Sequence, residues 1–274
     1  MFDALQFDFM RYALLAGVLA SIACGIVGTF IIVKRLVFVS GGISHAAFGG
    51  LGMCYFLGWP PLFGAFLMAA LVAFVLGRER FDSNQSNDAA IGVLWSVGMA
   101  LGIVFIAKTP GYAPNLMSYL FGDILTVTLS DVVAIAVLDG VLLLVLALLY
   151  KELLAISFDS TFAQVQQIPV RFLQTLLLLL VGATVVVLIQ VVGIVLVLAL
   201  LSIPTLVSLR FTHRFARVIV LSMFVSLVLV LVGFATSFYF DLPTGPSIVL
   251  CGALMLGIAE VVDRGRVRLR RVNA

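Results

Sequence analysis

The sequence predicts an all-α integral membrane protein, a polytopic bundle of about eight or nine transmembrane helices with the N-terminus outside and the C-terminus in the cytoplasm. Its 274 residues are 63% hydrophobic and 11% charged, with a mean hydropathy of +1.26, which excludes a soluble globular domain of ordinary composition. Apolar runs recur along the whole chain. Of the 16 Lys and Arg residues, all except Arg11 and Lys108 fall on one side of the predicted bundle, as the positive-inside rule expects of the cytoplasmic face.

The predicted helices are bounded by charged residues or by Pro and Gly, and each is close to the roughly 20 residues that a crossing needs. In order they cover residues 9–33, 36–57, 61–77, 89–107, 130–150, 172–190, 191–209, 217–239 and 246–262. The sixth and seventh lie in one apolar run that is too long for a single crossing, so we expect a tight hairpin near Gln190 to Gly193. An eight-helix version with one re-entrant segment is the alternative. No room is left for a separate soluble domain, so residues 1–274 are expected to form one transmembrane domain.

Apart from the polar cytoplasmic segment described next, four segments are not plain transmembrane helices. Residues 108–114 contain two prolines and a glycine and predict an outer turn. Residues 119–125 are too short to cross and predict a re-entrant segment. Residues 241–246 break the chain again on the same side, and residues 263–274 form a basic cytoplasmic tail.

The longest polar cytoplasmic segment covers residues about 151–171. Within it, Phe158, Phe162, Val165 and Ile168 are spaced as one face of a short helix that ends before Pro169. An apolar stripe on a short cytoplasmic helix indicates docking to another protein.

His45 is the first candidate functional residue, because an ionisable ring at membrane depth is costly unless it faces a partner or a water-filled path. In helical spacing Gly41, His45 and Gly49 share one face, and Gly42, Ala46 and Gly50 form a neighbouring row. Small residues in such a row allow close helix approach, and the glycines around His45 are expected to leave space at the imidazole. The ring could ligate a divalent metal or hydrogen-bond to a neighbouring helix.

Asp139 is the only acid near the middle of a predicted crossing. It is either a second ligand, a relay, or a structural hydrogen-bonding group. His213 lies among basic residues and is expected to be solvated. The three cysteines have no metal-binding spacing. The chain also lacks a GxxxxGK[ST] loop, a HExxH and a GxSxG motif, so we expect no enzyme activity and no ATP hydrolysis by this chain.

Several motifs, in this order along nearly the whole chain, resemble the permease subunits of bacterial zinc, manganese and iron uptake ABC transporters. They are SGGISHAAFGGLG at 40–52, DAAIG at 88–92, LFGDIL at 120–125, FDS at 158–160, QVVGIVLVLALLSIP at 190–204 and DLPTGPS at 241–247. The resemblance implies a multi-pass protein of the bacterial plasma membrane, with a divalent metal as transported substrate and no permanently bound cofactor. It implies a second copy of the chain, cytoplasmic ATPase subunits that hydrolyse the ATP and an extracytoplasmic metal-binding protein as partners, and no nucleic acid.

The resemblance also assigns roles to residues. Phe158, Asp159, Phe162, Val165 and Ile168 are expected to contact the ATPase, and His45 to meet the metal in transit. Many members carry an aspartate four residues before the histidine, where this chain has Gly41, and a glycine where it has Gln167. The missing acid predicts a weak transit ligand and leaves the metal open.

Three function hypotheses follow. The leading one is the permease of an ATP-driven metal importer. The second is a secondary carrier driven by an ion gradient, with Asp139 and His45 as its proton-coupled pair. The third is an ABC permease for a metal chelate, in which His45 only packs.

Overall fold

The computed structural model describes residues 7–78, 85–110, 122 and 126–272, and every regular element in these ranges is a helix, as predicted. The helices are α1 (Asp8–Val33), α2 (Val37–Phe56), α3 (Pro61–Arg78), α4 (Gln85–Lys108), α6 (Leu129–Phe158), α7 (Ser160–Val165), α8 (Val170–Val192), α9 (Ile194–Phe211), α10 (Phe215–Phe240) and α11 (Thr244–Val272). Eight of the described helices are long and apolar enough to cross a membrane, and α3 is a shorter apolar helix over Pro61–Gly77. Each of the nine predicted runs is therefore a helix.

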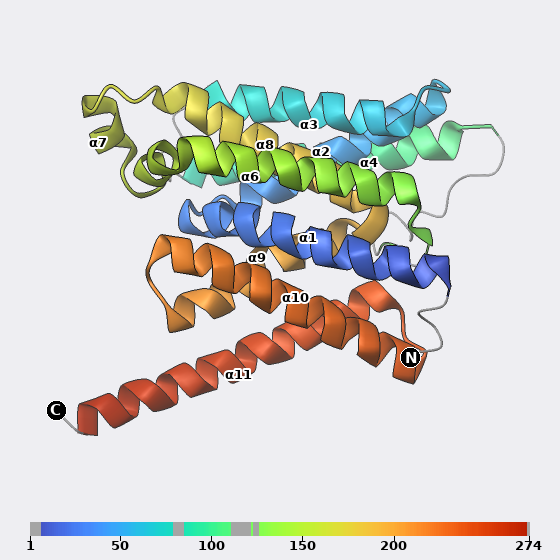
Figure 1. The fold of residues 1–274 in the computed structure, drawn as a ribbon. Coiled ribbons are helices and arrows are strands. Elements are labelled where there is room, and N and C mark those ends of the chain that lie inside the picture. Colours follow the sequence, from blue (N-terminus) through green and yellow to red (C-terminus); the bar gives the residue numbers. More distant parts are fainter. Residues whose placement is uncertain (1–6, 79–84, 111–121, 123–125, 273–274) are drawn as a thin grey trace.

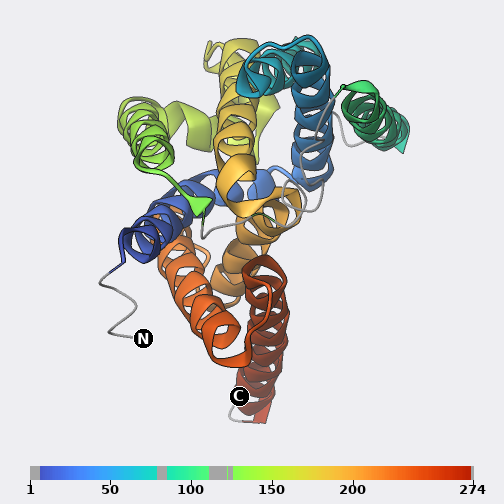
Figure 2. The same cartoon turned by 90° about the vertical axis from the view of Figure 1, so that its right-hand side faces the viewer.

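The long helices lie side by side in a bundle (Figure 1), with α3 and α11 far apart on its two sides. The N-terminus and the C-terminus lie at opposite ends of the bundle, and α7 lies at the same end as the C-terminus. This arrangement agrees with an odd number of crossings. Seen from the end that carries the N-terminus (Figure 2), α8 runs between the group of α2 and α3 and the group of α1, α9 and α10.

The predicted hairpin near Gln190 to Gly193 is confirmed, because Gly193 alone separates α8 from α9. Its φ of 79° and ψ of 159° lie in a region that is essentially open to glycine only. The chain can therefore end one helix and begin the next within one residue, although both sides of the break are apolar.

The boundary predicted at residue 150 is wrong. Helix α6 continues to Phe158, with a local kink at Leu149 (φ −118°, ψ 20°). The predicted run ends at residue 150 because Lys151 and Glu152 begin the polar segment, but charged residues with long side chains favour helix as well as apolar ones do, so the charge marks the end of the apolar run and not the end of the helix. The distortion at Leu149 therefore lies within a helix that continues for nine more residues, to Phe158.

Parts of the predicted outer segments lie outside the described residues, namely 111–114 of the outer turn and all of 119–125 except Gly122. Gly122 has a φ of 75°, and a Cβ there would overlap the backbone of Val192. The break at 241–246 is confirmed: Asp241, with a φ of 50°, ends α10, and α11 begins at Thr244.

Candidate functional site

Helix α2 is built of small residues and lies between α3 and α4. A Cβ on Gly49 would lie 2.8 Å from the carbonyl oxygen of Gly98, and one on Gly52 would lie 2.6 Å from that of Gly102, both on α4. On its other side, Gly50 meets the backbone of Gly64 on α3. The expectation that small residues allow close helix approach is confirmed.

His45 is buried at 7% exposure in this packed layer. Its ring stacks on the indole of Trp95 of α4, with ring centroids 4.5 Å apart and planes at 23°. Its Nδ1 is buried and has no hydrogen-bond partner among the described residues. The site thus holds one ring nitrogen whose bonding capacity is unused, next to an aromatic face.

The prediction that glycines leave space around the imidazole is wrong. A Cβ on Gly41 would lie 2.9 Å from Cζ3 of Trp95. The space beside Gly49 is filled by the backbone of Gly98. The rows of small residues admit α4 instead of a ligand, because van der Waals contact drives helix association in a membrane. Nothing in the sequence of α2 alone could have indicated Trp95, which lies 50 residues further along the chain.

Few other groups near His45 could hold a metal. The Ser44 hydroxyl donates to the Ser40 carbonyl at 2.7 Å, and the Ser40 hydroxyl donates to the Val37 carbonyl at 2.8 Å. Over the described part of the chain, no three His, Cys, Asp or Glu side chains are grouped as metal ligands would be. A single copy of the described chain therefore offers a metal at most a weak, one-histidine site here.

A cavity of about 420 Å³ lies beside this stack. Its lining comes from α2, α4 and α9: Val37, Phe38, Gly41, Trp95, Leu198, Ala199, Ser202 and Ile203. The one hydroxyl in it, on Ser202, donates to the Leu198 carbonyl at 2.8 Å. Two sequence motifs, at 40–52 and 190–204, thus meet at one largely apolar cavity, which their separation in the sequence did not predict.

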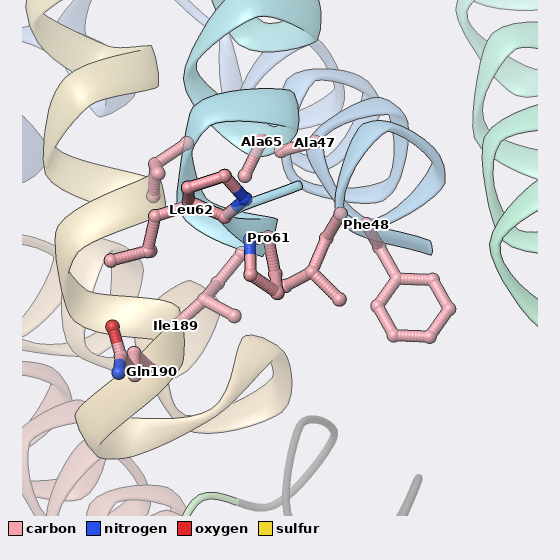
Figure 3. Close-up of a pocket in the computed structure, with 10 residues that line it drawn as sticks. Ala47, Phe48, Pro61, Leu62, Ala65, Ile189 and Gln190 are labelled. Carbon is pink, nitrogen blue, oxygen red and sulfur yellow. The ribbon is translucent and has the colours of Figure 1, made fainter. Parts of the chain in front are cut away.

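A second cavity, of about 170 Å³, lies at the far end of α2 between α3 and α8. Figure 3 shows Ala47 and Phe48 of α2, Pro61, Leu62 and Ala65 of α3, and Ile189 and Gln190 of α8 around it. Gln190 is the one residue of this lining with a polar side chain, and it lies in the last turn of α8, three residues before the break at Gly193.

Asp139 lies elsewhere in the bundle. It is 4% exposed on α6, and neither carboxylate oxygen has a hydrogen-bond partner in the described structure. Its electrostatic neighbour is Cys24 of α1, and α6 packs against α1 and α8, whereas α2 packs against α3, α4 and α8. The structure therefore does not bring Asp139 and His45 together as a pair.

The predicted docking stripe is divided between elements. Asp159 caps α7, with its Oδ1 accepting from the backbone N–H groups of Thr161 (2.9 Å) and Phe162 (2.8 Å). This cap ends α6 at Phe158 and starts a separate six-residue helix. The prediction that Phe158, Phe162, Val165 and Ile168 share one face of a single helix is wrong, because only Phe162 and Val165 lie on α7 and Ile168 is partly buried against the core.

The exposed part of the stripe is nevertheless apolar. Phe158 is 67% exposed, Phe162 58% and Val165 77%, at the end of the bundle where α7 and the C-terminus lie. Ile168 and Gln167 turn the chain back into the bundle: Gln167 takes a left-handed φ of 59°, and the Ile168 N–H donates to the Ala163 carbonyl at 3.1 Å. His213 lies at the same end between α9 and α10 and is exposed, as expected.

This helix order and the two meeting motifs agree with one group of known proteins. Residues 6–262 match the family model described as ABC 3 transport family. The chain belongs to that family. As a member of the ABC 3 transport family, with eight apolar helices of spanning length among its described residues, it is a multi-pass protein of the plasma membrane.

Similar proteins cover nearly the whole chain. The membrane protein slr2045 of Synechocystis sp. is 41% identical over 93% of this chain and 90% of its own length. The manganese transport system membrane protein MntC of Halalkalibacterium halodurans is 32% identical over 93% of this chain and 87% of its own. A chain in the structure of PsaBC from Streptococcus pneumoniae in complex with Fab superposes with a TM-score of 0.83 at 30% identity, covering 94% of this chain and 93% of that chain.

Proposed function

We propose that this chain is the transmembrane permease of an ABC importer that moves a divalent metal, Mn²⁺ or Zn²⁺ and less favoured Fe²⁺, into the cytoplasm. The observation that carries the proposal is the full-length similarity to a manganese transport system membrane protein combined with family membership. The chain contains no phosphate loop, so the ATP is hydrolysed on separate ATPase subunits.

The proposed path runs along the cavity between α2, α4 and α9, where Trp95 of the lining stacks on the ring of His45. The unpartnered Nδ1 supports this role, because a neutral imidazole ligates borderline divalent cations. One imidazole per chain holds a metal weakly, and a second copy of the chain facing the first adds a second imidazole. A weak site suits transit, because the ion must leave as readily as it enters.

The proposed ATPase contact is the exposed apolar surface of Phe158, Phe162 and Val165. Asp159 caps the short helix α7 that carries Phe162 and Val165, and Ile168 packs the following segment against the core of the bundle. An extracytoplasmic metal-binding protein delivers the ion at the opposite end. Both partners are inferred from the resemblance of this chain to metal ABC transport systems.

The secondary-carrier alternative is less favoured because its proton-coupled pair is divided between α6 and α2. The chelate alternative needs a path wide enough for a large ligand, whereas Trp95 and Gly98 fill the space at His45. The name of the manganese transport relative supports manganese as a transported metal.

The test is reconstitution of the chain with its ATPase and binding protein in liposomes that contain a metal-sensitive dye. We expect uptake of Mn²⁺ or Zn²⁺ only with ATP on the ATPase side, and competition among Mn²⁺, Zn²⁺ and Fe²⁺ ranks the metals. Uptake that follows a proton gradient without ATP would overturn the proposal in favour of a secondary carrier.

His45→Ala is expected to lower uptake on the order of tenfold, the size seen when a group that supports metal binding is removed, while the protein still reaches the membrane. His213→Ala is the matched control, since that histidine is exposed at the end of the bundle. Equal uptake by both variants would reduce His45 to a packing residue.

A further inference from the structure

Lys34 lies in the three-residue connection between α1 and α2. Its ammonium Nζ donates to the main-chain carbonyl of Ile156, 2.6 Å away. Ile156 belongs to the last turn of α6, where the final carbonyl groups of a helix have no partner within the helix. The bond therefore joins two elements that are 122 residues apart in the sequence.

The bond lies close to the start of two helices, α7 and α2. Four residues after Ile156 the helix α7 begins, and three residues after Lys34 the helix α2 begins. Along α2, His45 lies eight residues beyond Val37, a rise of about 12 Å at about 1.5 Å per residue. One hydrogen bond thus links the base of the exposed apolar stripe to the base of the helix that carries His45.

The connection on the α2 side is stiff. Arg35 takes a left-handed φ of 58°, the Arg35 N–H donates to the Ile32 carbonyl at 3.1 Å, and the Leu36 N–H donates to the Ile31 carbonyl at 2.8 Å. Leu36 is buried. The connection is therefore held by its own backbone hydrogen bonds and by the burial of Leu36.

Aromatic contacts strengthen the same junction. The ring of Phe215, at the start of α10, meets Phe30 of α1 with centroids 5.1 Å apart and Phe158 of α6 with centroids 5.9 Å apart, both edge to face. Tyr150 lies 6.3 Å from the same ring. The end of α6, the end of α1 and the start of α10 are held together around Phe215, so the Lys34 bond is part of a packed junction.

The bond also has the character of a strong contact. Lys34 is partly buried, and burial lowers the pKa of its ammonium to about 8, so the group still carries its proton at pH 7. A charged donor makes a shorter and stronger hydrogen bond than a neutral one.

We propose that Lys34 is a positioning residue that transmits movement of the ATPase-docking segment through the end of α6 to α2 and His45. The proposal rests on the function proposed above. It assigns to a residue outside both the docking surface and the metal path the task of connecting them.

The test compares Lys34→Met, which keeps the aliphatic stem and removes the donor, with Lys34→Arg, which keeps a charged donor. Lys151→Met, on an exposed lysine at the same end of α6, is the matched control. In liposomes with ATPase and binding protein, both metal uptake and ATP hydrolysis are measured. We expect Lys34→Met to lower uptake per ATP hydrolysed about tenfold, the loss of one charge-assisted bond, with ATP hydrolysis retained, and Lys34→Arg to recover part of the ratio.

An unchanged ratio of uptake to hydrolysis in Lys34→Met would overturn the proposal, as would an equal loss in Lys151→Met. Amide hydrogen exchange of the full chain in detergent micelles, without partners, separates this outcome from failure of the proposed function. Faster exchange in both residues 34–40 and 155–160 of Lys34→Met, absent in Lys151→Met, is expected even if the chain transports something else. No change in either segment would show that the two helices are not linked through Lys34.

Discussion

The Trp95 ring of α4 fills the space that a side chain at position 41 would need, and position 41 is a glycine. A Cβ on Gly41 would come within 2.9 Å of the Trp95 ring, which itself stacks on His45. The resemblance implies an aspartate at this position, and here the Trp95 indole lies in the space that a side chain at position 41 would enter. The departure noted in the sequence therefore has a structural counterpart, namely Trp95.

This pairing predicts the behaviour of Gly41→Asp. Alone, the substitution should destabilise the protein by about 1–3 kcal/mol, because it overpacks a filled site and buries a carboxylate. Combined with Trp95→Ala it should cost less than the sum of the two single changes, since the indole no longer blocks the new side chain. Thermal unfolding in detergent measures the coupling, and calorimetry with Mn²⁺ or Zn²⁺ should detect tighter binding by the double variant.

Gly49→Ala is the steric control for this experiment, because it clashes with Gly98 and not with Trp95. Additive effects in the Gly41 and Trp95 cycle would show that the ring does not occupy the space needed by an acid.

At the scale of the elements, the sequence alone predicted nine helices because each run is apolar and is ended by charge, Pro or Gly. The end of α6 was missed because Lys151 and Glu152 leave the apolar layer without leaving the helix. The docking stripe was assigned to one helix because spacing alone does not register that Asp159 caps a new one. Trp95 could not be predicted at His45, since the contact depends on the packing of α4 against α2.

The exposed residues on α7 predict the effect of Phe162→Asp. The ring is 58% exposed and its loss costs the bundle little, whereas a carboxylate in an apolar docking surface is desolvated without a partner. We expect the ATPase subunit to be lost on co-purification while the permease remains folded. Phe240→Asp is the matched control, an exposed phenylalanine at the end of α10 away from α7, and should retain the ATPase. Retention by both variants would move the docking surface elsewhere.

At the scale of the whole molecule, α11 is the outermost layer on its side and packs on α9 and α10. It has a long exposed apolar face, including Leu250, Leu254, Ile258 and Val261, which suits contact with lipid or with a second copy of the chain. At the end of α9, Arg210 reaches across to Glu260 at 2.6 Å and to Asp263 at 3.6 Å, and Arg264 joins Glu260 at 3.0 Å. This small ionic network attaches α11 to the end of α9, near the point where the apolar part of α11 ends.

Arg210→Met should loosen that attachment without unfolding the bundle. The ion pairs are partly exposed, so the loss of stability should be modest, about 1 kcal/mol, and should shrink as added salt screens the wild-type pairs. Local opening is the more sensitive readout: amide exchange over residues 255–263 should rise, while exchange in α1 and α2 stays unchanged, because the buried contacts of those helices do not depend on Arg210.

Arg217→Met, an exposed arginine at the start of α10, is the control. Reversing the charges together in Arg210→Glu and Glu260→Arg should restore part of the protection, since one ion pair is rebuilt, although Asp263 then faces a like charge. If exchange in α11 is the same in Arg210→Met and wild type, apolar packing against α9 and α10 alone holds the outer helix in place.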